Sequence, residues 1–216
     1  MKPFAGCRLY TFIDTAYLGR REPAAVAKEL CDGGADLIQI RAKHATADEV
    51  LRLAEVVLPI ANAAGTGVII NDHPEVAIRA GAMACHLGQE DFFGAGRTRA
   101  AEVTGQPPGT GLGLSTHSPE QAIQAIAAAP DYIAVGPVYP TPTKPGVPAV
   151  TLDYVKWAAR HVSLPWFAIG GITLANLDEV LDAGATRICV VSAILRAPDV
   201  ARACQAFKDR LVSRPV

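Results

Sequence analysis

Short apolar runs alternate along this chain with segments of helical periodicity. The runs are four to seven residues long and are bounded by glycine, proline or polar residues, which is typical of strands buried on both faces. The helical segments repeat apolar residues at spacings of three and four. This pattern predicts strands at 8–14, 37–41, 67–70, 84–87, 110–115, 132–135, 166–169 and 187–191, and helices at 23–31, 48–63, 75–80, 119–129, 152–161, 176–183 and 198–212.

Helix boundaries follow from local signals. Ser118 is the expected N-cap of the helix at 119–129, and Pro119 suits its first position because proline lacks a backbone N–H. Glycines end several of the other helices, including Gly65 after 48–63. The segment 94–109 has the least regular pattern.

The alternation predicts the fold class. Eight strands separated by helices over 216 residues indicate a parallel sheet covered by helices, and eight such units indicate a single-domain (β/α)8 TIM barrel spanning 1–216. An open doubly wound sheet is the alternative, but it should carry a glycine-rich dinucleotide loop after the first strand, and none is present. No linker divides the chain.

Composition narrows the class of protein. Half of the residues are hydrophobic and the net charge is −1, so no basic surface for nucleic acid is indicated. No apolar stretch reaches the length of a membrane span, and the N-terminus lacks the apolar core of a signal peptide. The five cysteines show no CxxC spacing, which favours reduced thiols in a cytoplasmic protein over disulfides or a zinc site.

Polar residues and glycines follow nearly every predicted strand. In a TIM barrel the carboxyl ends of the strands carry the active site, so these residues should converge there, whereas chance loop polarity would scatter them. They are Gln39, Arg41 and Lys43; Asn71 and Asp72; His86, Gln89, Glu90 and Asp91; Ser115, Thr116 and His117; Gly170 and Gly171; and Ser192.

The segment 132–146 (YIAVGPVYPTPTKPG) begins as a buried strand and continues as a proline-rich stretch, which we expect to be a stiff loop on the surface. Thr141, Thr143 and Lys144 would let it hold a phosphorylated ligand. A plain connector with a solvated lysine is the alternative. Gly170 and Gly171 suit close approach of the backbone to a phosphate, although a tight turn needs glycine too.

Asp72 and Asp91 follow neighbouring strands and are suitable ligands for Mg²⁺, which takes one or two carboxylates and completes its shell with water and phosphate oxygens. Helix N-capping is the alternative role for both. Arg41, Lys43 and Lys144 would surround the same anion. Three cations and Mg²⁺ exceed what one monophosphate needs, so we infer a diphosphate, with a second phosphate near Gly171 and Ser192.

The ordered set of segments IQIRAK, VIINDH, HLGQEDF, GLSTH, GPVYPTPTKPG, FAIGGI and VVSAI resembles the thiamine-phosphate synthase family. The resemblance implies transfer of an aminopyrimidinylmethyl group from hydroxymethylpyrimidine diphosphate to hydroxyethylthiazole phosphate. It implies that Asp72 and Asp91 bind Mg²⁺ and that Arg41, Lys43, Ser115 and Lys144 are catalytic. The resemblance further implies two substrate sites. The pyrimidine diphosphate would be bound by Gln39, Arg41, Lys43, Asn71, Ser115 and Lys144. The thiazole phosphate would be bound by Thr141, Thr143, Gly171, Val191 and Ser192.

The chain departs from the family pattern at Ala42, where an acidic residue is usual, at His73, where a basic residue is usual, and in TFIDT of the first strand. The implied reaction loses diphosphate to give a stabilised carbocation, a step that needs charge stabilisation rather than a strong base. We accordingly expect no nucleophile–base pair. A hydrolase pair of Ser115 and His117 lacks the nucleophile-elbow pattern, and His86 is expected to be a packed imidazole.

Three other functions remain open at this point: a thiazole tautomerase, a phosphosugar isomerase or epimerase, and a non-catalytic binding barrel. The Asn71–Asp72 and HLGQED segments argue against the first, because a tautomerase does not need a metal-diphosphate site. The partners expected are the two small-molecule substrates, with no nucleic acid and no membrane. A homo-oligomer is compatible with the sequence.

Overall fold

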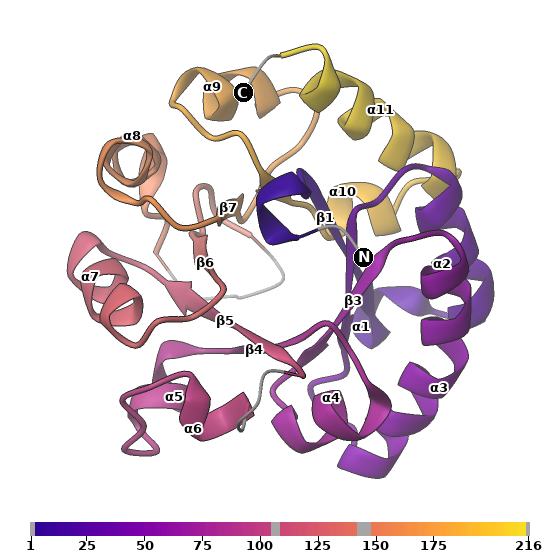
Figure 1. The fold of residues 1–216 in the computed structure, drawn as a ribbon. Coiled ribbons are helices and arrows are strands. Elements are labelled where there is room, and N and C mark those ends of the chain that lie inside the picture. Colours follow the sequence, from indigo (N-terminus) through magenta and orange to yellow (C-terminus); the bar gives the residue numbers. More distant parts are fainter. Residues whose placement is uncertain (1–2, 105–108, 142–147, 215–216) are drawn as a thin grey trace.

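The computed structural model describes residues 3–104, 109–141 and 148–214. Eight parallel strands close into a barrel in chain order, as predicted, and β1 pairs with β8 through Leu9 and Ile188 (Figure 1). The strands are β1 (Leu9–Asp14), β2 (Leu37–Arg41), β3 (Gly67–Asn71), β4 (Ala84–Leu87), β5 (Gly111–Thr116), β6 (Tyr132–Val135), β7 (Trp166–Ile169) and β8 (Ile188–Cys189).

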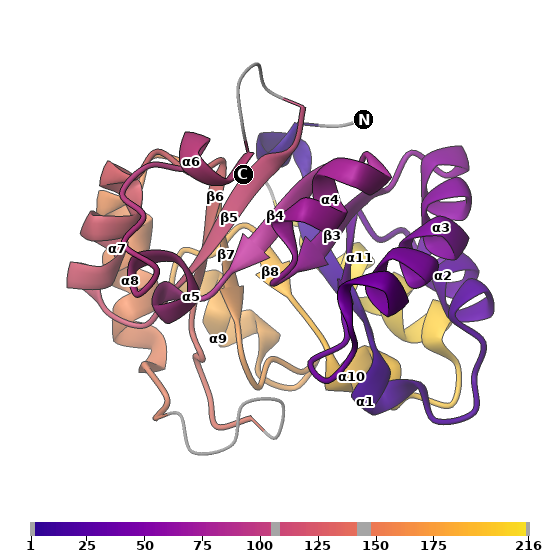
Figure 2. The ribbon, with the colours of Figure 1, turned by 90° about the horizontal axis from the view of Figure 1, so that it is seen from below.

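Helices surround the barrel, and the short helices α1 and α10 lie beside the carboxyl ends of the strands (Figures 1 and 2). The predicted helices are confirmed within one or two residues at each end. They are α2 (Pro23–Asp32), α3 (Ala47–Ala63), α4 (Pro74–Ala80), α7 (Pro119–Ala127), α8 (Thr151–His161), α9 (Leu177–Asp182) and α11 (Val200–Val212).

Capping explains where two of these helices begin. The Ser118 side chain accepts a hydrogen bond from the Gln121 backbone N–H, which confirms it as the N-cap of α7. At the start of α3, Thr46 and Glu49 form a capping box in which each side chain bonds the other residue's backbone N–H. Both helices therefore satisfy backbone donors that their first turns leave unpaired.

The structure departs from the predicted elements in its connections. A 3-10 turn, η1 (Phe4–Gly6), and four short helices were not predicted: α1 (Thr15–Leu18), α5 (Gln89–Phe93), α6 (Ala101–Thr104) and α10 (Ser192–Leu195). The helices have four or five residues each, too few to show a helical repeat in sequence. β8 is also shorter than predicted, because Val191 leaves the extended conformation to cap α10.

The loop after β6 is only partly as expected. Gly136, Pro137 and Val138 are buried, and the Val138 N–H donates to the Ile169 carbonyl at 2.8 Å. The expectation of a surface loop was wrong for these three residues, because they extend along the end of β7. Within its described part, the segment reaches the surface at Tyr139 and Pro140.

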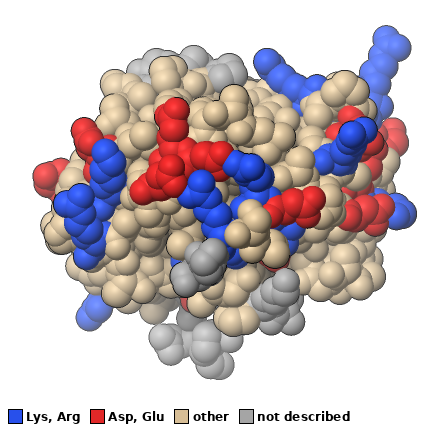
Figure 3. Space-filling model, turned by 90° about the horizontal axis from the view of Figure 1, so that it is seen from above, with Lys and Arg blue, Asp and Glu red and all other residues tan. Residues whose placement is uncertain are grey.

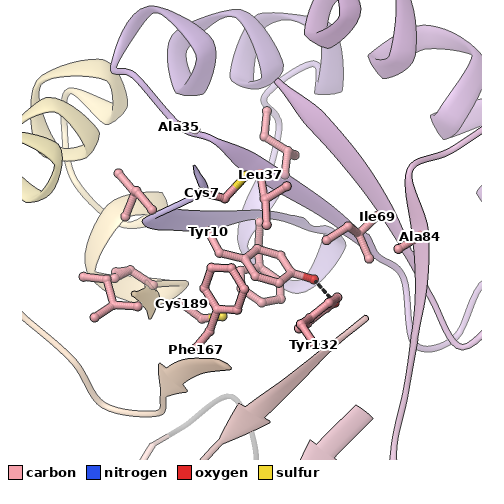
Figure 4. Packing of buried hydrophobic residues seen from close by; sticks show 14 of the residues in the cluster. Cys7, Tyr10, Ala35, Leu37, Ile69, Ala84, Tyr132, Phe167 and Cys189 are labelled. Carbon is pink, nitrogen blue, oxygen red and sulfur yellow. Dashed lines mark hydrogen bonds between the residues drawn. The ribbon is translucent and has the colours of Figure 1, made fainter. Parts of the chain in front are cut away.

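Aromatic rings pack together in the barrel interior, beside aliphatic side chains such as Leu37 and Ile69 (Figure 4). Tyr10, Tyr132 and Phe167 are at most 1% exposed, and Phe167 meets both tyrosines edge to face (Figure 4). Gly113 makes this packing possible, because a Cβ there would lie 2.0 Å from the Tyr132 ring. A small residue on β5 thus leaves the space that a large one on β6 occupies.

Acidic and basic side chains are interspersed on the outer face shown in Figure 3, which gives no single-sign field on that face. Ion pairs also join α9 to the end of the chain: Asp178 pairs with Arg210 of α11 and with Arg214 just beyond it, and Asp182 pairs with Arg214. No described helix is long and apolar enough to cross a membrane. The five cysteines, all among the described residues, carry thiols and not disulfides, and four of them are buried.

Candidate active site

A pocket opens at the carboxyl ends of the strands, and all eight strands contribute side chains or backbone to it. Eleven residues predicted for the site line it: Gln39, Arg41, Lys43, Asn71, Asp72, Asp91, Ser115, Thr141, Gly171, Val191 and Ser192. The predicted convergence is therefore confirmed for these residues, although their individual roles are not. Thr143 and Lys144 lie outside the described residues.

Arg41 ends β2 and is held by an aspartate from β1. Its guanidinium donates to the Asp14 carboxylate at 2.6 Å, and the two side chains are 13% and 1% exposed. The other Asp14 oxygen accepts the Ala16 backbone N–H at 3.0 Å and caps α1. Sequence reasoning gave Asp14 no role. The available signal was an aspartate directly after the apolar run of the first strand.

Lys43 lies just beyond β2 and pairs with Asp72 beyond β3. The Nζ–Oδ2 distance is 2.5 Å, and the side chains are 42% and 26% exposed, so solvent reaches this pair. Asp72 has a φ of 65°, a left-handed conformation that aspartate tolerates better than most residues. The N-cap of α4 is His73, so helix capping, the alternative role for Asp72, is wrong.

Asp91 projects from the first turn of α5 and is exposed. The N-cap of that helix is Gly88, so Asp91 is not a cap either. A Cβ at Gly88 would lie 2.9 Å from the Asp91 Oδ2, so the glycine makes room for the carboxylate. Asp72 and Asp91 line one pocket, and among the described residues no group of three or more His, Cys, Asp or Glu side chains could hold a metal by itself.

Ser115 pairs with His86, not with His117. The Ser115 Oγ lies 2.9 Å from His86 Nε2, and the other ring nitrogen lies 3.0 Å from the Tyr132 hydroxyl. His86 is buried and hydrogen-bonded, as predicted. The sequence did not indicate this contact, because residues from β4 and β5 that are far apart in sequence become neighbours only across the sheet.

The turn after β7 lines the pocket with main chain and is called the main-chain wall. Gly170 and Gly171 follow β7 with φ values of 103° and 66°, where residues with side chains are strained. A Cβ on Gly171 would also lie 2.8 Å from the Pro140 carbonyl oxygen. Ser192 stands nearby at the start of α10. The positive φ values and the close approach of the segment 137–140 explain both glycines as turn residues, and their approach to a phosphate stays a prediction.

Comparison with known proteins agrees with this geometry. Residues 9–194 match the model of the family described as thiamine monophosphate synthase. A thiamine-phosphate synthase of Thermus thermophilus is 48% identical over 182 residues, which cover 83% of this chain and 84% of the relative. One from Acidothermus cellulolyticus is 43% identical over 212 residues, covering 97% of each chain.

Among solved structures, a thiamine phosphate pyrophosphorylase from Pyrococcus furiosus superposes with a TM-score of 0.84 at 26% identity, covering 96% of each chain. A 3-hexulose-6-phosphate synthase superposes at 0.61 with 18% identity, which shows a shared fold alone. The barrel, the converging site residues and these relatives lead to one conclusion. The chain belongs to the thiamine monophosphate synthase family and is a transferase.

Proposed function

We propose that the chain joins hydroxymethylpyrimidine diphosphate to hydroxyethylthiazole phosphate, releasing diphosphate and forming thiamine phosphate with the help of Mg²⁺. The observation that carries the proposal is the single pocket into which eleven of the implied substrate and metal residues converge. A parallel barrel brings any strand-end residues to one mouth, so the support comes from the kind of residues found there: two cations, two carboxylates, two amides and several hydroxyls.

The charged side of the pocket suits a diphosphate. Arg41 is the last residue of β2, and Lys43 follows two residues later. Both line the pocket. Asp14 anchors the guanidinium, so Arg41 is oriented before a ligand arrives and loses little conformational freedom on binding. Lys43 is the more exposed of the two cations and can turn from Asp72 to a phosphate oxygen.

The donor set fits Mg²⁺. Two carboxylates, Asp72 and Asp91, line the pocket beside Asn71, and Mg²⁺ usually takes only one or two carboxylates from the protein. The ion pair between Lys43 and Asp72 supports this, because it places a cation beside the Asp72 carboxylate. When bound, the metal would neutralise charge that develops on the departing diphosphate.

The proposed reaction is dissociative. The electron-rich aminopyrimidine supports a benzylic-type cation once the bond to diphosphate breaks, and the thiazole nitrogen then forms the new bond to carbon. The protein's part is to hold both rings and to stabilise the leaving anion. Gly171, Ser192 and Thr141 would hold the thiazole phosphate on the main-chain wall, and Lys144 is proposed to contact both substrates.

The test is to mix the two substrates with the purified protein, with Mg²⁺ and with a chelator, and to follow thiamine phosphate and diphosphate. We expect equal amounts of both products with Mg²⁺ and little of either with the chelator. Lys144→Ala should weaken the use of both substrates. Absence of thiamine phosphate under all conditions would exclude the proposed reaction.

The contact between Ser115 and His86 favours one alternative, a thiazole tautomerase, because such an enzyme needs a proton carrier in the pocket. The partner on the other ring nitrogen is a phenol, which supports an imidazolium less well than a carboxylate does. Supplying the thiazole isomers alone separates the two activities. Tautomer exchange without the pyrimidine substrate would favour the alternative.

A further inference from the structure

Five polar side chains form a continuous hydrogen-bonded chain across the barrel interior. Gln39 Nε2 donates to the Tyr10 hydroxyl at 2.5 Å, and the Tyr10 and Tyr132 hydroxyls are 3.0 Å apart. The Tyr132 hydroxyl lies 3.0 Å from His86 Nδ1, and His86 Nε2 lies 2.9 Å from the Ser115 Oγ. This hydrogen-bonded chain begins at Gln39 and ends at Ser115, and both residues line the pocket.

The middle of this hydrogen-bonded chain is buried and packed between aromatic rings. Tyr10 and Tyr132 are 1% and 0% exposed, and their hydroxyls face each other in Figure 4. Phe167 packs against both rings at 5.4 and 5.5 Å between centroids. Burial raises the pKa of both tyrosines well above the usual value, so each hydroxyl keeps one proton. Each can therefore donate one hydrogen bond.

Counting these protons gives the chain a direction. Because Tyr10 accepts a hydrogen bond from Gln39, its own proton goes to Tyr132. The Tyr132 proton then goes to His86 Nδ1, which leaves the imidazole proton on Nε2. That proton is donated to the Ser115 Oγ, and the hydroxyl proton of Ser115 is left for the pocket.

If the donor and acceptor roles are exchanged at one end of the hydrogen-bonded chain, they are exchanged in every hydrogen bond along it. If the Gln39 amide turned over, its oxygen would accept the Tyr10 proton, and each later hydrogen bond would change direction. Ser115 would then donate to His86 and offer only lone pairs to a ligand. A protonated imidazole would donate from both nitrogens and leave the Tyr10 proton without an acceptor in this chain. Only a neutral His86 protonated on Nε2 fits the observed Gln39 contact.

We propose that Tyr10, Tyr132 and His86 are positioning residues that couple the two ends of this chain. They hold the Gln39 carbonyl oxygen toward the pocket as an acceptor and, at the same time, keep the Ser115 hydroxyl as a donor. The site thereby selects a ligand that presents a hydrogen-bond donor to Gln39 and a hydrogen-bond acceptor to Ser115. This rests on the proposed function for the ligand's identity: an aminopyrimidine diphosphate has an amino donor and several acceptor oxygens.

The first test needs no substrate. Nitrogen NMR of the protein labelled at its five histidines distinguishes the two neutral tautomers, and His86→Gln identifies the His86 signals. We expect the wild-type imidazole to be protonated on Nε2 alone. Tyr132→Phe removes the donor to Nδ1 and should give a mixture of tautomers. A wild-type His86 protonated on Nδ1, or a tautomer unaffected by Tyr132→Phe, would overturn the proposal.

The second test measures coupling in turnover. Tyr132→Phe and Tyr10→Phe keep the packed rings and each should lower kcat/KM about tenfold, roughly 1.4 kcal/mol. Tyr154→Phe is the matched control, because it removes a buried hydroxyl that bonds Thr116 Oγ1 at 2.7 Å outside the chain. We expect it to change kcat/KM less than about twofold.

Ser115→Ala decides whether Tyr132 acts through the serine. In that background Tyr132→Phe should cause a smaller further loss than in wild type, because only the orientation of Gln39 is then left for it to disturb. Full additivity, or equal kinetic losses in Tyr132→Phe and Tyr154→Phe, would contradict the coupling. If the wild-type protein forms no thiamine phosphate, the proposed function fails, while the NMR measurement still decides the direction of the chain. If Tyr132→Phe does not fold, Tyr10→Phe breaks the same chain.

Discussion

Two aspartate–lysine pairs of equal length lie in different surroundings. Asp36 pairs with Lys208 at 2.5 Å, with side chains 3% and 19% exposed, where the chain enters β2. Asp72 pairs with Lys43 at the same distance, with side chains 26% and 42% exposed, in the pocket at the other ends of the strands. The two ion pairs therefore have the same residue types and the same length but differ in how far solvent reaches them.

The difference lies in what else each carboxylate binds. The Asp36 carboxylate also accepts the backbone N–H groups of Arg8 and Leu9 at 2.9 and 3.0 Å. Its partners are protein groups in fixed positions, which is typical of a structural ion pair. Asp72 pairs with a long, partly exposed lysine and lines the pocket, so its partner can be exchanged. Burial and backbone hydrogen bonds distinguish a structural pair from one available to ligands.

Removing the structural pair should have the largest effect. Asp36→Ala leaves two backbone N–H groups and a largely buried ammonium without their partner, so we expect the free energy of unfolding to fall by about 3 kcal/mol. Urea unfolding followed by circular dichroism measures this. Turnover per folded molecule should stay at the wild-type value, and a specific loss of turnover would break the distinction.

Removing the carboxylates of the pocket should act on turnover instead. Asp72→Ala and Asp91→Ala are each expected to slow turnover at least about tenfold, roughly 1.4 kcal/mol of barrier, because charge stabilisation on the leaving group is lost. Steady-state assays across Mg²⁺ concentrations measure this, with circular dichroism to confirm the fold. Asp48→Ala, on the outer helix α3, is a control of equal charge change. Wild-type rates in both pocket variants would contradict the proposal that Asp72 and Asp91 bind Mg²⁺.

Asp14→Asn sharpens the comparison, because Asp14 is buried like Asp36 but holds a pocket residue. The asparagine oxygen can still accept the Ala16 N–H, so α1 keeps its cap while Arg41 loses its counter-charge. We expect the KM of the diphosphate substrate to rise about fivefold, roughly 1 kcal/mol. The KM of the thiazole phosphate is the internal reference, and an equal rise in both would indicate a general distortion.

The smallest expected effect is on the pH dependence of stability. Burial by itself raises the pKa of Asp36, but the hydrogen bonds from Lys208, Arg8 and Leu9 outweigh it and leave the pKa below its ordinary value. A depressed pKa contributes stability above the unfolded-state value of about 3.9, which is lost as the pH falls further. Asp36→Asn should therefore lose less stability than wild type between about pH 4 and pH 2 in thermal melts. Parallel curves would contradict this.

Much of the barrel could be predicted from local patterns. A buried parallel strand is a short apolar run whatever its neighbours, and four of the predicted strands have the bounds observed: 37–41, 84–87, 132–135 and 166–169. The short helices α5 and α10 could not be found, because four or five residues carry no repeat and are held by the ends of the barrel strands.

The convergence of the site was also predictable, because in a parallel barrel every carboxyl strand end faces the same side. Sequence order therefore placed Asp72, Asp91 and Arg41 at one mouth before any distance was known. The partners of these residues were not predictable. Asp14 with Arg41 and Ser115 with His86 are contacts between strands, and their existence depends on register and on which rotamer the packing permits.

The sequence by itself determined the kind of elements, their order and the end of the barrel at which chemistry gathers, because these follow from periodicity and chain direction. The tertiary structure alone decided which polar groups form hydrogen bonds with one another inside the barrel. The Gln39–Tyr10–Tyr132–His86–Ser115 chain draws on five strands, and hydrogen bonds form only within about 3 Å. A one-residue change of register would turn these side chains to the outside and separate them.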